Sequence, residues 1–490
     1  MHNVLMVNSS LPFSSPSPVR SVRAIQRTSG AIAVAVRTNG AVPRGIGLSR
    51  RALERHGFTA KVGQSLVVPR ADGQTVIAVG VGSRPTSNDL RDAAAAAVRA
   101  GSRLGSLAID LISAGSSARA DGRAVAEGAL LAAYQYPGIT KKPLTSPRFS
   151  EIAIVTGGSA AAERGVREGV VTSRAAYLAR DLANTPPAHL NARDLEGIVL
   201  QLGEQFGFGV EVFDEHDLER MGCGGLLGVN RGSVEPPRLM KLTYEPRNPS
   251  AHVALVGKGV MYDSGGISLK PSDAFHVVMK MDMSGAAAVL STLTALKDLR
   301  CRVKVTGYLV CTDNMPSGSA MKLGDVLTMR NGKTVEVHNT DAEGRLILAD
   351  GLSLAVEQQP DAIFDIATLT GAAMAALGPD IAAVLGSDAA VIDRVRHSAE
   401  ATGEPVWQMP LERTRYRRLL DSNVADMRNI GGPYGGCITA AVFLSEFTGD
   451  IPWAHLDIAG PMKVDGDESW RSKGATGFGT RLLIDVVTSW

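Results

Sequence analysis

Four carboxylates in two regions of this sequence are the groups best suited to chemistry. Asp341 and Glu343 are two residues apart, so in an extended chain both side chains point to one face. Asp263 lies in a Gly-rich stretch, and Asp282 precedes a run of small residues. Four carboxylates gathered in an apolar cleft would repel one another and be mostly protonated, unless divalent cations bound them through oxygen. Two metal ions would balance four such charges; the alternative is that these acids are ordinary surface and loop residues.

Three cationic side chains occupy the same regions. Lys258 and Lys270 lie in the Gly-rich stretch just beyond the apolar run His252–Gly257, and Arg345 is two residues after Glu343. In open α/β sheets, functional sites form in loops beyond the carboxyl ends of strands, which is where this stretch is expected. The sequence contains no Gly-x-Ser-x-Gly, His-Glu-x-x-His or Walker A motif, so serine nucleophiles and thermolysin-type zinc chemistry have no local support.

The segments that must position these groups alternate between strand-like and helix-like. In the first third, strands such as Thr75–Val81 alternate with Ala-rich helices such as Asn88–Ala100, with Asn88 placed to cap that helix. We expect a long helix over Ala160–Ala183. It should end at the sequence Asn184-Thr185-Pro186-Pro187, because proline cannot continue a helix. The remainder repeats the pattern on a larger scale, which predicts a mixed sheet between two layers of helices.

This organisation predicts an α/β protein in four parts. We expect a loose tail over residues 1–20, a small N-terminal α/β domain of macro-like type over 21–165, a linker helix over 166–185, and a larger α/β/α catalytic domain over 186–490. The strands expected in the larger domain are Val210–Phe213, His252–Gly257, Arg302–Leu309, Ala362–Ala367, Ile381–Leu385 and Pro452–Asp457.

The overall composition excludes several classes of protein. The 490 residues are 44% hydrophobic and 20% charged, which is typical of a folded globular chain. The net charge of +2 gives no bulk attraction to nucleic acid or an anionic membrane, and no long uncharged apolar run predicts a transmembrane helix. The four scattered cysteines fit a reducing compartment. The Arg- and Ser-rich start has the composition of a transit peptide, but Arg and Ala are abundant throughout, so we favour a cytoplasmic protein.

Several long motifs resemble the leucine aminopeptidase (cytosol aminopeptidase) family. The run Asn339–Leu346 (NTDAEGRL) matches that family's signature, and Val256–Pro271, Met279–Ala288, Ala367–Gly371 and Trp453–Gly460 resemble its other motifs in the expected order. The resemblance covers residues 175–490 and implies a metal-dependent exopeptidase. Such an enzyme releases N-terminal amino acids, preferably Leu or other apolar residues, from peptides by attack of water activated by two metals.

The resemblance also implies roles for individual residues. Two divalent metal ions, Mn or Zn with Co or Mg as alternatives, would be bridged by Asp263 and Glu343. Asp341 would complete one metal site, and Lys258 and Asp282 the other. The catalytic cations would be Lys270, which would stabilise the oxyanion, and Arg345, which would hold a bicarbonate ion as general base with the help of Ala342, Gly344 and Leu369. The pocket for the first side chain would be lined by Lys270, Met279, Thr368, Gly371, Ala459 and Met462, although Met279 and Met462 are also plausible as plain core residues.

The partners implied are peptides with a free N-terminus and further copies of the same chain, since members of that family form homohexamers. A nucleic-acid-binding regulator is the rival from another class, and the near-zero net charge speaks against it. A catalytically inactive scaffold is a third alternative. It is disfavoured because all five ligand positions and both catalytic cations are retained.

Overall fold

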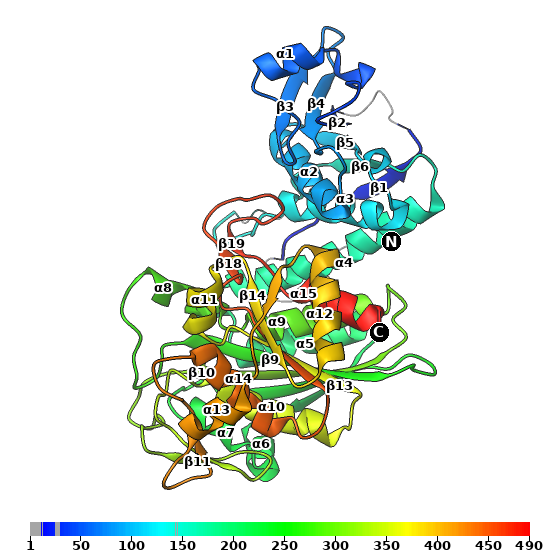
Figure 1. The fold of residues 1–490 in the computed structure, drawn as a ribbon. Helices are drawn as coiled ribbons and strands as arrows, with labels where there is room; N and C mark the ends of the chain where they lie inside the picture. Colours follow the sequence, from blue (N-terminus) through cyan, green and yellow to red (C-terminus); the bar gives the residue numbers. More distant parts are fainter. Residues whose placement is uncertain (1–10, 12, 25–29, 143, 145) are drawn as a thin grey trace.

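The protein folds as two α/β domains, seen in a computed structural model that describes residues 11, 13–24, 30–142, 144 and 146–490 (Figure 1). The smaller N-terminal domain is blue to cyan in Figure 1, and the larger domain is green to red. The long helix α4 (Ala160–Asn184) runs along their junction. It packs on α3 (Ala118–Ala133) of the first domain and on α9 (Ser284–Leu296) of the second.

The N-terminal domain is built on a six-stranded sheet in the order β1-β6-β5-β2-β4-β3. All neighbours pair in parallel except β3 and β4, so the expected βαβ pattern holds across most of the sheet. The buried alanines of α2 and α3 allow these helices to pack closely on the sheet. The elements are β1 (Val19–Val22), β2 (Ala31–Val36), α1 (Arg50–Arg55), β3 (Ser65–Pro69), β4 (Thr75–Gly80), α2 (Ser87–Ala100), β5 (Ser106–Asp110), α3 and β6 (Glu151–Val155).

The expectation of a loose tail over residues 1–20 is wrong for its last part. Residues 1–10 and 12 lie outside the described residues. Ser14 is buried, and both its backbone N–H and its hydroxyl donate to the carboxylate of Asp181, at 2.7 and 2.5 Å. Val19 then begins β1, which pairs in parallel with β6. The segment is held because its partners, one of them 167 residues away, are in the folded domains.

The predicted cap of α2 is also corrected. Thr86, not Asn88, is the N-cap, and it forms a capping box in which Thr86 accepts from the backbone of Asp89 and Asp89 accepts from that of Thr86. Asn88 lies in the first turn, where its side chain donates to the backbone oxygen of Glu400 in the larger domain at 2.9 Å. Its role is therefore a contact between domains.

The larger domain contains an eight-stranded mixed sheet in the order β15-β14-β17-β13-β9-β10-β8-β7. The central strands β17, β13, β9 and β10 are parallel, while β14, β8 and β7 pair in antiparallel fashion with their neighbours toward the centre. The mixed sheet is thus confirmed, although β8 was not predicted and β9 extends beyond the expected end. The strands are β7 (Gly209–Phe213), β8 (Arg238–Tyr244), β9 (His252–Asp263), β10 (Lys304–Asn314), β13 (Ala362–Ala367), β14 (Ala382–Gly386), β15 (Val406–Gln408) and β17 (Trp453–Asp457).

Helices cover both faces of this sheet and enclose two hydrophobic cores. One core packs α4, α5 (Ala192–Phe206), α9, α12 (Ala389–Thr402) and α15 (Thr480–Thr488) against one face. The other packs α6 (Glu215–Met221), α7 (Gly224–Asn230), α10 (Gly344–Glu357) and α14 (Gly436–Leu444) against the opposite face. In the described part of the chain, no helix is long and apolar enough to cross a membrane. The short elements are α8 (Ala274–Val277), α11 (Gly371–Leu377), α13 (Arg413–Tyr416), β11 (Val326–Thr328), β12 (Thr334–Glu336), β16 (Met427–Arg428), β18 (Lys463–Val464) and β19 (Gly474–Ala475).

Candidate metal centre

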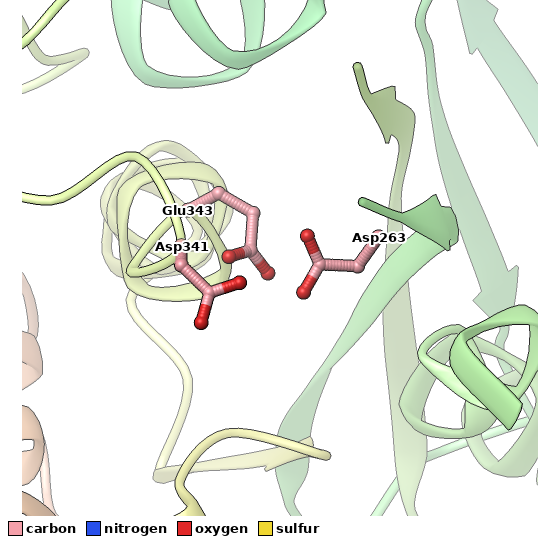
Figure 2. Close-up of side chains that lie close together, drawn as sticks. All are labelled: Asp263, Asp341 and Glu343. Carbon is pink, nitrogen blue, oxygen red and sulfur yellow. The ribbon is translucent and has the colours of Figure 1, made fainter. Parts of the chain in front are cut away.

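The carboxylates expected to bind metal come together beyond the carboxyl end of β9. Asp263 is the last residue of that strand, and Asp341 and Glu343 precede the first turn of α10. Figure 2 shows the three side chains pointing toward one another. One oxygen from each lies within 4.8 Å of the other two, and Asp263 and Glu343 are 3% and 1% exposed. This arrangement is compatible with oxygen ligands sharing a cation.

The convergence of Asp341 and Glu343 has a different origin from the one expected. The backbone there is a turn, not an extended strand, and Glu343 already has helical dihedral angles. The turn is held by the side chain of Asn339, whose oxygen accepts from the backbone N–H of Asp341 at 2.8 Å. The two carboxylates therefore meet because the chain turns into α10.

Two lysines balance the charge of the carboxylates. Nζ of Lys258 lies 2.8 Å from Oδ2 of Asp282 and 2.8 Å from Oε1 of Glu343, and it donates to the backbone oxygen of Thr368. Burial lowers the pKa of Lys258, but the surrounding carboxylates outweigh burial and raise that pKa above its ordinary value. Burial, together with the charge of nearby Asp263, raises the pKa of Glu343. The crowding of acids that the sequence suggested is thus present.

Lys270 makes the second set of ion pairs. Its Nζ lies 2.8 Å from Oδ2 of Asp263 and 2.5 Å from Oδ1 of Asp341. The two ammonium groups together contact all four carboxylates. They occupy the places where positive charge is needed, and so they stand in for the charge that bound cations would supply.

The residues present fit divalent cations. Oδ2 of Asp282, Oδ1 of Asp341 and Oε1 of Glu343 are buried, and the only partner of each among the described residues is a lysine ammonium, at 2.8, 2.5 and 2.8 Å. Each oxygen keeps a further lone pair that no protein group uses. Buried acceptors with unused lone pairs are costly unless they meet a cation. The donor set is mostly oxygen with one amine, which suits Mn, Mg or Zn.

Further polar groups orient the carboxylates. Sequence reasoning assigned no role to Asn314 and expected Thr368 only in the substrate pocket. Nδ2 of Asn314 donates to Oδ1 of Asp263 and to the backbone oxygen of Thr340, both at 2.9 Å. The hydroxyl of Thr368 donates to Oδ1 of Asp282 at 2.6 Å. Gly265 has φ +86, and a Cβ there would lie 2.8 Å from Oδ1 of Asp341, so a larger residue would crowd the site.

Arg345 lines the same cavity as the carboxylates, and so do Ala342 and Leu369, two of the residues expected to hold an anion with it. Arg345 is 5% exposed, and its Nη1 donates to the backbone oxygen of Asn429. Its Nε is buried without a partner in the described part of the chain. The backbone N–H of Leu369 donates to Oδ1 of Asp457 at 3.2 Å. Gly344 lies close to the side chain of Lys258: a Cβ at position 344 would be 2.7 Å from Nζ of Lys258.

One cavity of about 240 Å³ joins the carboxylates to the residues expected to bind substrate. Met279 and Met462, which line it, are each 4% exposed. A larger cavity of about 680 Å³ lies between α2 and α12. Among its charged residues, Arg91 is paired with Glu127 and Arg396 with Asp393, and among the described residues none of its acids belongs to a group that could share a cation. The chemistry therefore belongs to the smaller cavity. Of the predicted residues, Lys258, Asp263, Lys270, Met279, Asp282, Asp341, Ala342, Glu343, Arg345, Thr368, Leu369, Gly371, Ala459 and Met462 line it.

Comparison with known proteins decides the family. The family model described as "Cytosol aminopeptidase family, N-terminal domain" matches residues 39–143. The model described as "Cytosol aminopeptidase family, catalytic domain" matches residues 177–484. The chain belongs to the cytosol aminopeptidase family. It is therefore an aminopeptidase of a metal-dependent family of hydrolases, and the resemblance inferred from the motifs is confirmed.

Relatives in the family match nearly the whole chain. A probable cytosol aminopeptidase of Chlorobium limicola is 41% identical over 459 residues, which is 88% of this chain and 90% of that protein. One of Streptomyces avermitilis is 42% identical over 459 residues, 89% of this chain and 88% of its own. The mixed α/β fold is shared with solved structures of this kind.

Two solved structures illustrate this fold. The bottromycin maturation enzyme BotP, also solved in complex with Mn, has a TM-score of 0.86 at 38% identity, covering 94% of this chain and 99% of BotP. A mutant of tomato leucine aminopeptidase has a TM-score of 0.87 at 29% identity, covering 98% of each chain.

Proposed function

We propose that this protein is a leucyl aminopeptidase that uses two divalent metal ions to release Leu and other apolar residues from the N-terminus of peptides. The observation that carries the proposal is the meeting of Asp263, Asp341 and Glu343 within 4.8 Å, beside an apolar pocket. Membership of a metal-dependent aminopeptidase family supports it, as does the solved Mn complex of BotP.

The metal ligands are proposed by position. Asp263, Asp341 and Glu343, whose oxygens lie within 4.8 Å of one another, would hold the two ions together with Asp282 and Lys258, which contact each other at 2.8 Å. Lys258 would have to be a neutral amine to act as a ligand, because only that form has a lone pair to donate. Two cations, when bound, would make water nucleophilic near neutral pH and balance the negative charge of the reacting carbonyl.

The cavity would select both the end of the peptide and its first side chain. The free amine of a peptide would be held at the metal centre through its lone pair, whereas an internal peptide bond offers no such group at this position. The first side chain would enter the apolar end beside Met279 and Met462, together with the small or short residues Thr368, Gly371 and Ala459. Flexible, apolar methionines suit Leu and Met side chains.

The two catalytic cations would act without holding metal. Lys270 has a side chain that is 17% exposed within the cavity, so its ammonium can reach a bound carbonyl and stabilise its developing charge. Arg345 would hold an anion such as bicarbonate, which would act as general base. Its Nε supports this role, because it is buried and has no hydrogen-bond partner among the residues that the structure describes. Ala342 lines the same part of the cavity and Gly344 follows Glu343, so backbone groups there could assist.

The proposal is tested with metal-free protein to which Mn, Zn, Co or Mg is returned. Hydrolysis of Leu-anilide should depend on added metal, and N-acetyl-Leu-anilide should be inert because acetylation removes the amine. Comparable turnover of Leu-anilide and N-acetyl-Leu-anilide would show that the enzyme does not require a free amine, and would refute the aminopeptidase assignment. Activity that survives complete metal removal would refute the metal mechanism.

The assembly, the location and the domain limits are also proposed. We propose that the protein forms a homohexamer and is located in the cytoplasm. Measuring the mass of the protein in solution tests the homohexamer. We further propose a division at residues 165 and 185; the two family matches, 39–143 and 177–484, are consistent with a break between the domains but do not define it.

A further inference from the structure

A buried carboxylate, that of Asp457, belongs to no step of the proposed mechanism. Asp457 is the last residue of β17, is 1% exposed and pairs with Ala367, the last residue of β13. It is not among the described residues that line the cavity of about 240 Å³. It lies, however, where two segments of chain leave the ends of these strands and enter the wall of that cavity.

These two segments form much of the pocket proposed for the first side chain of the peptide. Thr368 and Gly371 follow β13, while Ala459 and Met462 follow β17, and all of them line the cavity. The segment after β13 is also held at the carboxylate cluster, because the hydroxyl of Thr368 donates to Oδ1 of Asp282 at 2.6 Å. The separation of the two segments therefore sets the width of the pocket beside that cluster.

Asp457 holds the two segments together. Its Oδ1 accepts from the backbone N–H groups of Leu369 and Thr370, at 3.2 and 3.3 Å. The same oxygen accepts from the backbone N–H of Ala459 in the other segment, at 3.2 Å. Oδ2 accepts from the hydroxyl of Thr370 at 2.6 Å. Hydrogen bonds to a carboxylate are stronger than those to a neutral acceptor, so this shared acceptor resists separation of the segments.

We propose that Asp457 is a positioning residue that fixes the width of the first side-chain pocket and thereby sets the preference for Leu over smaller residues. The inference rests on the proposed aminopeptidase function. A pocket of fixed width rejects a small side chain because the gap beside it gives up packing contacts, whereas walls that move apart give up the contacts with Leu as well. Without the Asp457 carboxylate, the N–H groups of both segments lose a buried acceptor, and the segments should separate to reach water.

The test compares Leu-anilide with Ala-anilide as substrates of the metal-loaded full chain. In Asp457→Ala, the ratio of kcat/KM for Leu-anilide to that for Ala-anilide should fall by about 10-fold, chiefly because KM for Leu-anilide rises. The metal content should stay that of wild type, since Asp457 is not a proposed ligand. Asp457→Asn keeps the measurement decisive if the alanine variant does not fold. Asparagine has one acceptor oxygen in place of two, so it loses either the contact with the Thr370 hydroxyl or those with the N–H groups, and the ratio should fall by roughly 3-fold.

Asp350→Ala is the matched control. Asp350 is 0% exposed in α10, and its carboxylate also accepts from backbone N–H groups, those of Leu226 and Arg330, both at 2.8 Å. It is not among the described residues that line the cavity. This variant should lose stability in thermal unfolding and keep the wild-type ratio.

Each other outcome overturns the inference in a distinguishable way. A ratio that neither variant of Asp457 changes removes its role in the pocket while leaving the aminopeptidase intact. An equal fall in Asp350→Ala would show that loss of any buried acceptor has this effect. Joint loss of metal and activity in Asp457→Ala would place its action at the metal centre instead of the pocket. If wild type hydrolyses neither anilide, the proposed function itself fails.

Discussion

Nζ of Lys258 lies 2.8 Å from Oε1 of Glu343, and both residues are almost completely buried. A buried ammonium in contact with a buried carboxylate is tolerated because each desolvated charge meets the other. The same ammonium also contacts Asp282. With cations bound, Lys258 would have to give up its proton to act as a ligand, and the carboxylates would supply the balancing negative charge. Loss of the Asp263 or Glu343 carboxylate therefore tests the metal site most directly.

Replacing Asp263 by Asn or Glu343 by Gln should remove both metal and activity. A neutral amide keeps the shape of the side chain but cannot balance two cations. Residues that only orient metal ligands typically cost about 10–100-fold in metal affinity or activity when they are replaced. Replacing a ligand itself should cost more, so kcat/KM should fall by more than about 100-fold. Elemental analysis and kinetics on the same samples check this, with the exposed Asp465→Asn as control. Two ions per chain and near-normal activity in either variant would show that the ligand assignment is wrong.

Asn314→Ala should weaken metal binding without removing a ligand. Its amide donates to Oδ1 of Asp263 and to the backbone of Thr340, so it fixes the direction of one ligand and the turn that carries the others. The expected loss in metal affinity is roughly 10–100-fold, with activity restored at high metal concentration. A metal titration followed by activity measures it, and the exposed Asn423→Ala should behave as wild type. An unchanged titration curve would mean that Asp263 needs no such support.

Asn314 also shows why part of the site escaped sequence analysis. The carboxylates were identifiable because acids in a Gly-rich loop after a strand have a chemical use and match a family motif. An amide has no comparable signal, and Asn314 reaches Asp263 only through an irregularity in the pairing of β10 with β9 between Thr312 and Asn314. Likewise, the contact of Ser14 with Asp181 joins positions 167 residues apart, and no local pattern predicts it.

Lys270→Ala should separate catalysis from metal binding. Lys270 is proposed to stabilise the developing oxyanion and not to be a ligand, so the dinuclear centre should stay filled. Loss of one such donor typically lowers kcat by about 10²–10³, or roughly 2.7–4 kcal/mol. Kinetics with metal content measured on the same preparations decide it, and Lys463→Ala, a surface lysine paired with Asp465, is the control. Full kcat in the variant, or joint loss of metal and activity, would contradict the assigned role.

Asp181 should make stability depend on pH near neutrality. Burial raises its pKa from an ordinary value of 3.8 to about 7, even though Ser14 and Tyr134 donate to its carboxylate. Because the folded pKa is raised, the contribution to stability is complete below the ordinary value and is lost as pH rises through about 7. The free energy of unfolding at pH 5 and pH 8 should differ less in Asp181→Asn than in wild type, by up to roughly 3 kcal/mol, because about two units of the pKa shift lie between pH 5 and pH 7. The other buried acids are common to both proteins, so an identical pH response would rule out this contribution.

Glu127 is a buried carboxylate that joins the two domains. It is 0% exposed in α3 and accepts from Arg91 of α2 at 3.0 Å, from Arg123 at 2.9 Å and from Arg481 of the C-terminal helix α15 at 2.9 Å. The hydroxyl of Thr172 in α4 donates to it at 2.7 Å. Burial alone would raise the pKa of Glu127, but the three guanidinium groups outweigh burial and hold that pKa well below its ordinary range. The negative charge of Glu127 therefore links α2, α3 and α4 to α15.

Glu127→Gln should destabilise the protein strongly and change its acid sensitivity. Removing one partner of a buried ion-pair network typically costs about 3–5 kcal/mol, because the remaining charges are left desolvated. Glu168→Gln is the control. It breaks the more exposed ion pairs of Glu168 with Arg119 and Arg164, and it should lower the free energy of unfolding by less than about 1 kcal/mol. Since the folded pKa of Glu127 is lowered, its contribution is present above the ordinary value of 4.5 and is lost as pH falls below it. Denaturation followed from pH 7 down to pH 3 should therefore show a loss in wild type that is smaller in Glu127→Gln. Equal stability of Glu127→Gln and Glu168→Gln at pH 7 would show that this network does not hold the domains together.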